Sequence, residues 1–344
     1  MPPRALSEAK KCPDGSPDTP TRPFAPSPAP ADSLHVAPYL GAQRDLLDRR
    51  RQDGSRHVCP DARILMTVYF NGDFMDKADV SISPDDRGFL FGDGVYEVVR
   101  AEDGALFQLD AHRRRLARSL EALKLHDVDT DALWTSVREL LPRNGLDAGS
   151  AKVYLQITRG AAPRRHAFPD PPVEPTVYAR ALPHEPPVEK WEHGVSVILH
   201  PDQRWARCDV KSLNYLPNVL ANQAAQEADA YEALLVRDGF VTEGTHSSVA
   251  AVFDGTVTTH PFTNRTLPSI TRQIMLELCD ELDLPIDEFP VAVDALPDAD
   301  ELFLMGTTTG IMPIVEVDDS TVGDGTPGPV TEELLEAFRA LDPA

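Results

Sequence analysis

The chain has 344 residues, of which 42% are apolar and 26% charged, which is enough to bury one large core or two smaller ones. Its formal net charge of -22 excludes nucleic acid and anionic membrane surfaces as its main partners, because both would be repelled. No stretch reaches the roughly 18 apolar residues of a spanning helix, and the N-terminal residues lack the apolar segment of a secretory signal. These features predict a cytoplasmic protein of one or two globular domains.

The four cysteines are far apart in the sequence and form no CxxC pair. Closely spaced pairs are typical of zinc sites and of disulfide frameworks, so neither is indicated. We expect reduced thiols and no bound metal at Cys12, Cys59, Cys208 and Cys279.

Residues 1–65 differ in composition from the rest of the chain. They hold 11 of the 32 prolines and show no sustained apolar periodicity, which predicts a disordered extension. A patterned sequence begins at Met66, so one hypothesis makes Met66 the true initiator, and the alternative is a natural flexible tail. The intact mass of the protein from its native source would distinguish the two.

The remainder of the chain is strongly acidic and contains only five lysines, whereas arginine carries most of its positive charge. An acidic surface with few lysines stays hydrated at high ionic strength, where self-repulsion is screened over a few ångströms. The composition therefore predicts adaptation to high salt in a halophilic source.

The elements of residues 66–183 predict a small α+β domain. Asn71 and Gly72 stand between two apolar runs, which is typical of a tight hairpin. A helix is expected with Asp110 as its N-cap and Leu125 near its end. Alternation and apolar periodicity predict a further helix over 130–142 and strands over 151–159 and 174–182.

A proline-containing stretch over 184–190 has the composition of an interdomain linker, because proline resists both helix and strand pairing. Residues 191–344 then form a second, larger domain. Its pattern predicts short strands separated at Asp238-Gly239 and Asp254-Gly255, and helices over 214–229, 270–282 and 331–341.

Glycine motifs exclude several common chemistries. Gly92-Asp93-Gly94 lacks the third glycine of a dinucleotide fingerprint, and the residues after it alternate like a strand instead of opening a helix. The chain also lacks the phosphate-loop, zincin and serine-hydrolase motifs.

Two residues are candidates for amine and carboxylate chemistry. Lys211 follows an expected strand end in a chain that has few lysines, and a lysine can act as a nucleophile where an arginine cannot. The alternative interpretation is a surface ion pair with Asp209. Glu243 lies at a glycine turn after a short strand, where a simple turn carboxylate is the alternative.

Several other segments have the residue types of an anion site. The amides of a helix that starts near Ile270 and Thr271 would suit a phosphate, and the Gly306-Thr307-Thr308-Thr309 turn offers further hydroxyl and amide donors. Arg115 lies among clustered arginines, which are usually solvated. The basic loop with Arg164, Arg165 and His166 stands out in an acidic protein, and arginine suits a carboxylate ligand.

In order along the chain, these motifs resemble the class IV, or fold type IV, pyridoxal phosphate enzymes, most closely the D-amino acid aminotransferases. The matching stretches begin at Asp86, Cys208, Val241, Ile270 and Asp300, and the resemblance covers nearly all of 67–344. It implies an α+β fold with a smaller N-terminal domain and a larger C-terminal domain built on a barrel-like core.

The resemblance implies a role for each candidate residue. Lys211 would bind the pyridoxal 5'-phosphate cofactor covalently and move the proton at the substrate Cα, and Glu243 would face the pyridine nitrogen. Tyr96, Arg164 and His166 would bind the substrate carboxylate, with Thr308 also contacting the substrate. The remaining cofactor contacts would come from Arg115, Leu267, Ile270, Thr271 and Thr307.

In the D-amino acid group the arginine and histidine of the basic loop come from the neighbouring subunit, so the resemblance implies a homodimer. The chain departs from the family at His246, where a small hydroxylated residue is more usual, and at Ser248, Val249 and Ala250. Arg165 is an additional arginine beside the expected carboxylate site.

The resemblance leaves several activities open. The leading prediction is transamination between a D-amino acid and a 2-oxo acid such as 2-oxoglutarate or pyruvate, favoured by the basic loop. A branched-chain L-amino acid aminotransferase is the main alternative, because Gly306-Thr307 is common there. An aminodeoxychorismate lyase, or a binding protein that has lost catalysis, is a further possibility, although the retained Lys211 and Glu243 argue against lost catalysis.

Overall fold

The computed structural model describes residues 66–126 and 128–341, which belong to one compact unit. The expectations for residues 1–65, including the disordered extension and the cysteines at positions 12 and 59, lie outside the described residues. Within the described part, no helix is both long and apolar enough to cross a membrane.

The first strands form the expected hairpin. Strand β1 (Thr67–Phe70) pairs antiparallel with β2 (Asp73–Asp76) through a two-residue turn. Asn71 has φ 48° and Gly72 has φ 102°, values that Asn and Gly adopt most easily. The hairpin prediction is confirmed.

A six-stranded antiparallel sheet contains this hairpin, with the strand order β2-β1-β6-β5-β3-β4. Its longest pairing joins β3 (Gly94–Glu102) to β5 (Ser150–Thr158) over nine residue pairs. The other strands are β4 (Ala105–Leu106) and β6 (Thr176–Pro183). The alternation after Gly94 therefore forms a strand, as predicted.

Helices α3 (Leu109–Ala122) and α4 (Thr130–Arg143) pack on the small sheet. The apolar core between them includes Leu116, Trp134 and Leu155, all at most 2% exposed. The predicted N-cap of α3 was wrong, because the helix begins after Gln108, a left-handed residue with φ 51°, and Asp110 lies in the first turn. Asp110 still lies at the helix end that favours a negative charge.

A short helix, α2 (Arg87–Phe91), lies between the hairpin and β3 and was not predicted. The Asp86 side chain accepts a hydrogen bond from the Gly88 amide, and Gly92 ends the helix with φ 66°. These are ordinary capping features, but the helix is too short to show an apolar periodicity.

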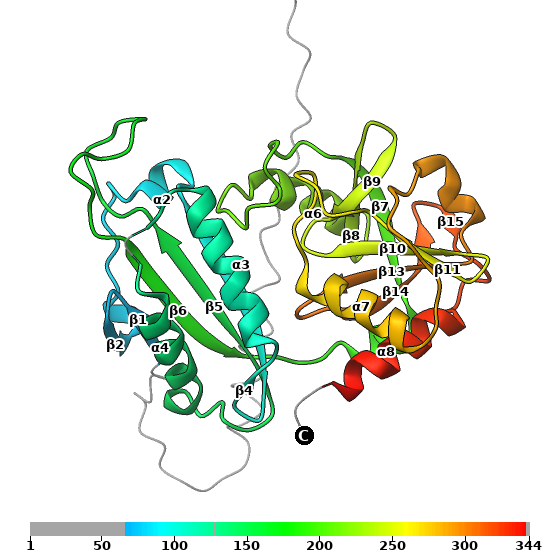
Figure 1. The fold of residues 1–344 in the computed structure, drawn as a ribbon, viewed down its shortest axis with the longest axis horizontal. Coiled ribbons are helices and arrows are strands. Elements are labelled where there is room, and N and C mark those ends of the chain that lie inside the picture. Colours follow the sequence, from blue (N-terminus) through cyan, green and yellow to red (C-terminus); the bar gives the residue numbers. More distant parts are fainter. Residues whose placement is uncertain (1–65, 127, 342–344) are drawn as a thin grey trace, which may run out of the picture. The chain divides into compact units, whose positions relative to one another are not determined.

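The second sheet has nine strands and curls into a half-barrel, which agrees with the predicted α+β fold and barrel-like core (Figure 1). Its main path runs β12-β11-β10-β13-β14-β7-β8-β9, and β15 pairs with β14. Most pairs are antiparallel, whereas β14-β7, β7-β8 and β11-β12 are parallel. The strands are β7 (Val195–Pro201), β8 (Glu232–Arg237), β9 (Phe240–Gly244), β10 (Ser248–Phe253), β11 (Thr256–Thr259), β12 (Ile286–Asp287), β13 (Glu301–Gly306), β14 (Gly310–Val317) and β15 (Ser320–Thr321).

Strand β8 shows why this sheet is covered on both faces. Leu234 belongs to the main core, whereas Ala233 and Leu235 pack with Ala221 and Ala225 of α6 (Leu216–Glu227). Alternate strand residues point to opposite faces, so the continuous apolar run reflects burial on both sides. The main core also receives α7 (Ile270–Glu281) and α8 (Pro329–Ala340), close to their predicted bounds.

The two sheets are joined after β6, where the linker was expected over 184–190. A short helix, α5 (Val188–His193), begins within this stretch, because Pro187 stands just before its first residue and a proline there does not remove an intrahelical hydrogen bond. Short 3-10 helices, η1 (Lys77–Asp79) and η2 (Val293–Asp298), complete the described elements. The division at this linker into a domain of 66–183 and a domain of 191–344 remains our proposal.

Candidate active site

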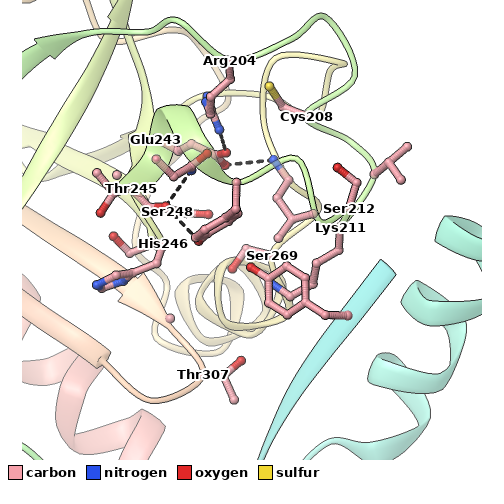
Figure 2. A pocket seen from close by; sticks show the side chains of 18 of the residues that line it. Arg204, Cys208, Lys211, Ser212, Glu243, Thr245, His246, Ser248, Ser269 and Thr307 are labelled. Atoms are coloured by element: carbon pink, nitrogen blue, oxygen red, sulfur yellow. Dashed lines mark hydrogen bonds and ion pairs between the residues drawn. The ribbon is translucent and has the colours of Figure 1, made fainter. Parts of the chain in front are cut away.

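A pocket lined by residues of both sheets contains most of the predicted site residues (Figure 2). Strand β3, helix α3, the loop before α6, the turn after β9, the segment before α7 and the end of β13 each contribute to its lining. The predicted residues in this lining are Tyr96, Arg115, Lys211, Glu243, Leu267 and Thr307.

Backbone pairing holds the segment that carries Lys211 against the start of β3. The Tyr96 amide donates to the Lys211 carbonyl at 3.1 Å, and the Leu213 amide donates to the Gly94 carbonyl at 3.0 Å. A Cβ at Gly94 would lie 2.4 Å from the Ile157 carbonyl oxygen and 2.8 Å from Leu213, so only glycine allows this approach. The second glycine of the Gly92-Asp93-Gly94 motif thus positions the lysine segment.

The Lys211 side chain is half-buried and lines the pocket. Its Nζ lies 4.3 Å from the centre of the Tyr96 ring. Burial, together with the nearby Arg115 charge, lowers the pKa of the Lys211 ammonium to about 8. The surface pairing of Lys211 with Asp209 is wrong, because Asp209 accepts two hydrogen bonds from Arg207 instead.

Glu243 lies at the end of β9 and is 7% exposed. Its carboxylate accepts hydrogen bonds from the Arg204 guanidinium and, at 2.9 Å, from the Leu267 amide. Burial raises the pKa of Glu243, and the Arg204 charge opposes the rise. Asp202 accepts from Nη2 of Arg204 at 2.8 Å and so fixes the guanidinium from its other side.

Arg115 is 5% exposed, so the alternative interpretation, a solvated arginine, is wrong. Its Nε and Nη2 each donate to the Glu97 carboxylate at 2.8 Å, and His112 Nδ1 lies 2.9 Å from the same carboxylate. Burial alone would raise the pKa of Glu97, but the charge and hydrogen bonds of Arg115 hold it well below the usual range. Nη1 of Arg115 lies 3.3 Å from the Pro268 carbonyl, just before α7.

The start of α7 borders the pocket. Ser269 is the N-cap, and its hydroxyl accepts a hydrogen bond from the Arg272 amide at 3.2 Å. Ser269 lines the pocket, whereas Ile270 and Thr271 are buried in the first turn and do not appear among its lining residues. Ile270 instead lines a neighbouring cleft that also contains Arg114 and Arg118.

Two tyrosines form one wall of the pocket. The rings of Tyr96 and Tyr215 meet edge to face with centres 5.6 Å apart, and the Tyr215 hydroxyl donates to the Thr245 carbonyl at 2.9 Å. Burial raises the pKa of Tyr96 well above its ordinary value and that of Tyr215 to about 12. Both phenols are therefore neutral hydrogen-bond donors near pH 7.

Three predicted substrate residues lie outside this pocket within one chain. Arg164 and His166 are on the exposed basic loop, where the Arg164 guanidinium lies 5.2 Å from the centre of the Phe91 ring and the His166 ring centre 5.9 Å from it. Thr308 lines a separate outer cavity. Arg87 donates to the Arg165 carbonyl at 2.6 Å and so fixes the loop to α2.

Sequence reasoning missed the partners that organise the site, namely Glu97, Arg204 and Glu232. Glu232 is fully buried and accepts hydrogen bonds from the Thr245 hydroxyl at 3.1 Å, the His246 amide at 2.8 Å and the Ser247 hydroxyl at 2.9 Å. A Cβ at Gly244 would lie 2.4 Å from a Glu232 carboxylate oxygen. The sequence signal for Glu232 was an acidic residue at the start of an apolar strand, where a charged side chain needs hydrogen-bond partners.

The donor set fits pyridoxal 5'-phosphate. Lys211, which has a lowered pKa, can form a bond to its aldehyde, and the buried Glu243 suits its pyridine nitrogen. Thr307, Ser269 and the first turn of α7 offer hydroxyl and amide donors to a phosphate, with one edge of Arg115 nearby. Leu267 supplies an apolar contact within the same lining.

Comparison with known proteins gives a consistent result. The model of the amino-transferase class IV family matches residues 94–317. A D-alanine aminotransferase of Bacillus licheniformis is 42% identical over 275 residues, which cover 80% of this chain and 96% of that protein, and one of Staphylococcus haemolyticus is 42% identical over 79% and 96%.

Among solved structures, the Escherichia coli branched-chain amino acid aminotransferase aligns with a TM-score of 0.74 and 26% identity, covering 80% of this chain and 94% of that one. A second branched-chain amino acid aminotransferase, solved with pyridoxamine 5'-phosphate, aligns with a TM-score of 0.73 and 26% identity, covering 80% and 93%. The predicted fold type agrees with these alignments.

Proposed function

The chain belongs to the class IV aminotransferase family, and we propose that it transfers the amino group of a D-amino acid to a 2-oxo acid with pyridoxal 5'-phosphate as cofactor. The observation that carries this proposal is the placement of the half-buried Lys211 and the buried Glu243 in one pocket, each held by backbone hydrogen bonds. D-Alanine is the first donor to test, because the similar curated proteins are D-alanine aminotransferases.

Three residues of the pocket, Lys211, Glu243 and Tyr96, have defined tasks in this proposal. When bound, the cofactor supplies an electron sink for the electrons released at the substrate Cα. Lys211, neutral above about pH 8, accepts and returns the Cα proton. Glu243, fixed by Arg204 and the Leu267 amide, presents its carboxylate to the pyridine nitrogen. Tyr96 contacts the lysine amine with its ring and so helps to orient it.

Arg115, Ile270, Thr271 and Thr307 would surround the cofactor phosphate, with Leu267 against its ring. Thr271 is 2% exposed at the first turn of α7, so its contribution would come from the helix start that it shapes. The two-point contact with Glu97 leaves Nη1 of Arg115 as the part of the guanidinium directed toward α7.

We also propose a homodimer in which Arg164 and His166 of one chain complete the substrate site of the other. Both side chains are exposed on a loop held by Arg87, away from the pocket of their own chain. An arginine offers two donors to an α-carboxylate, and this loop is basic in a protein of net charge -22. Thr308 would contact the substrate from the turn after β13.

A branched-chain L-amino acid aminotransferase remains the second candidate, because the solved structures named above have that activity and the fold is shared. The sequence identity to D-alanine aminotransferases, 42% against 26% for the branched-chain structures, favours the D-specific function.

The acidic, lysine-poor composition supports activity in a cytoplasm of high salt concentration.

The proposal is tested by incubating the cofactor-loaded protein with D-alanine and 2-oxoglutarate and by measuring pyruvate together with the chirality of the glutamate formed. D-Glutamate in amounts equal to pyruvate is expected, and Lys211→Ala should form neither. L-Glutamate formed from L-leucine would instead support the branched-chain function. Pyruvate released from aminodeoxychorismate without any amino acceptor would support the lyase.

A further inference from the structure

A second cavity of about 440 Å³, open to solvent, lies at the surface beside the pocket that contains Lys211. Its walls come from the β5 and β6 ends, the linker before α5, and the turn after β13. The residues that line it are Lys152, Pro183, His184, Glu185, Pro187, Tyr231, His246, Thr308 and Thr309.

Within the described part of the chain, His246 is the residue that lines both this outer cavity and the Lys211 pocket. The turn after β13 runs along the same boundary, with Thr307 in the pocket and Thr308 in the outer cavity. Figure 2 shows the His246 imidazole on the side of the pocket away from Cys208 and Ser212. The imidazole thus lies between the Lys211 pocket and the outer cavity.

The imidazole is 46% exposed and contacts two neighbouring side chains, Glu232 and Tyr231. Its Nδ1 lies 3.3 Å from a Glu232 carboxylate oxygen, and the His246 amide donates to the other oxygen at 2.8 Å. The Tyr231 ring meets it edge to face, with ring centres 6.5 Å apart. Glu232 is itself fully buried and also accepts from the Thr245 and Ser247 hydroxyls, so it is a fixed anchor for the imidazole.

We propose that the His246 side chain sets the size of the substrate side chain that the pocket accepts, by closing the pocket toward the outer cavity. This inference rests on the proposed transamination. With the imidazole in place, short side chains such as the methyl group of D-alanine fit. Without it, the pocket joins the outer cavity, where Tyr231, Thr308 and Thr309 can contact a longer aliphatic chain.

The test compares His246→Ala with the wild type, both loaded with cofactor, in single-turnover reactions with D-alanine and D-norleucine. The ratio of the D-norleucine rate to the D-alanine rate should rise at least about tenfold in His246→Ala, the scale of discrimination that a few methylenes produce in a pocket. His246→Gln keeps similar bulk and can still donate to Glu232, so it should keep the wild-type ratio.

A second measurement does not depend on turnover. Calorimetric titration with propanoate and hexanoate should show that His246→Ala binds hexanoate more tightly relative to propanoate, again by at least about tenfold. His193→Ala removes an exposed histidine that lines neither cavity and should change nothing. If His246→Ala fails to fold, His246→Ser takes its place, since a serine hydroxyl can donate to Glu232 as that of Ser247 does.

The outcomes separate the two proposals. Unchanged ratios in a folded His246→Ala or His246→Ser variant that still reacts with D-alanine would overturn the role of His246, as would a broadened range in His246→Gln. A wild-type protein that does not react with D-alanine would instead overturn the D-specific function, and the two acids alone would then decide the role of His246.

Discussion

Arg115 and Glu97 form a two-point ion pair in the interior of the protein, with Nε and Nη2 of the arginine each 2.8 Å from a carboxylate oxygen. Glu97 is fully buried on β3, and Arg115 is 5% exposed on α3. The pair therefore ties α3 to β3, the strand that also pairs with the Lys211 segment. It fixes the position of the arginine expected at the cofactor phosphate.

Glu97→Gln should destabilise the protein by about 3 to 5 kcal/mol, because it leaves the buried Arg115 charge uncompensated. Chemical denaturation measures this change in the free energy of unfolding. Glu139→Gln is the matched control, since Glu139 and Arg143 form an exposed pair along α4, and it should cost less than about 1 kcal/mol. Equal losses in the free energy of unfolding for the two substitutions would show that the buried pair stabilises the protein no more than the exposed pair does.

The lowered pKa of Lys211 predicts how its reactivity depends on pH. A lysine reacts with acylating reagents as the neutral amine, and that form of Lys211 grows as pH rises toward about 8 and changes little well above it. Pulse labelling of the cofactor-free protein with acetic anhydride, read by mass spectrometry, should show this plateau. Lys190 is exposed and provides the comparison in the same digest. If labelling of Lys211 kept rising steeply up to pH values near the pKa of an ordinary lysine, this would contradict the lowered pKa.

Arg164 and Lys211 provide a test of the shared site. Arg164→Ala should weaken substrate binding by about 2 to 4 kcal/mol, and Lys211→Ala should abolish turnover. When the two variants are mixed and allowed to exchange subunits, a mixed dimer contains one site with both side chains intact, so activity should return to about a quarter of the wild-type level. Arg165→Ala, the neighbouring arginine, is the control for loss of charge. Failure of the mixture to regain activity would contradict a site built from two subunits.

Salt should stabilise the protein if its acidic surface is an adaptation. The protein has a formal net charge of -22, so its acidic side chains repel one another, and molar KCl shortens the range of that repulsion to about 3 Å. We expect the Tm to rise steadily between about 0.1 and 2 M KCl, measured by scanning calorimetry. A Tm that stayed level or fell over this range would refute salt adaptation.

The sequence predicted those features that depend on neighbouring residues. The turns at Asn71-Gly72, Asp238-Gly239 and Asp254-Gly255 adopt positive φ angles, as expected for their residue types. The helices that begin near Thr130 and Ile270 follow from apolar periodicity. The start of α3 was misplaced because Gln108, a residue without a strong capping preference, precedes the first turn.

The parts of the site that were missed depend on residues far apart in the sequence. Glu97 is 18 residues from Arg115, and Arg204 is 39 residues from Glu243. No local sequence pattern predicts which buried carboxylate will pair with a given arginine, because sheet pairing and helix packing bring the two side chains together. The burial of Arg115 could not be predicted from the sequence for the same reason.

The most direct test of the proposed function is a single-turnover reaction in high salt without any 2-oxo acid. The visible absorbance of the bound cofactor is followed after separate addition of D-alanine, D-glutamate, L-leucine and L-glutamate. The D-specific function predicts loss of this absorbance with D-alanine and D-glutamate only, and no change in Lys211→Ala. Loss of absorbance with L-leucine but not with D-alanine would contradict it and would assign the protein to the branched-chain group.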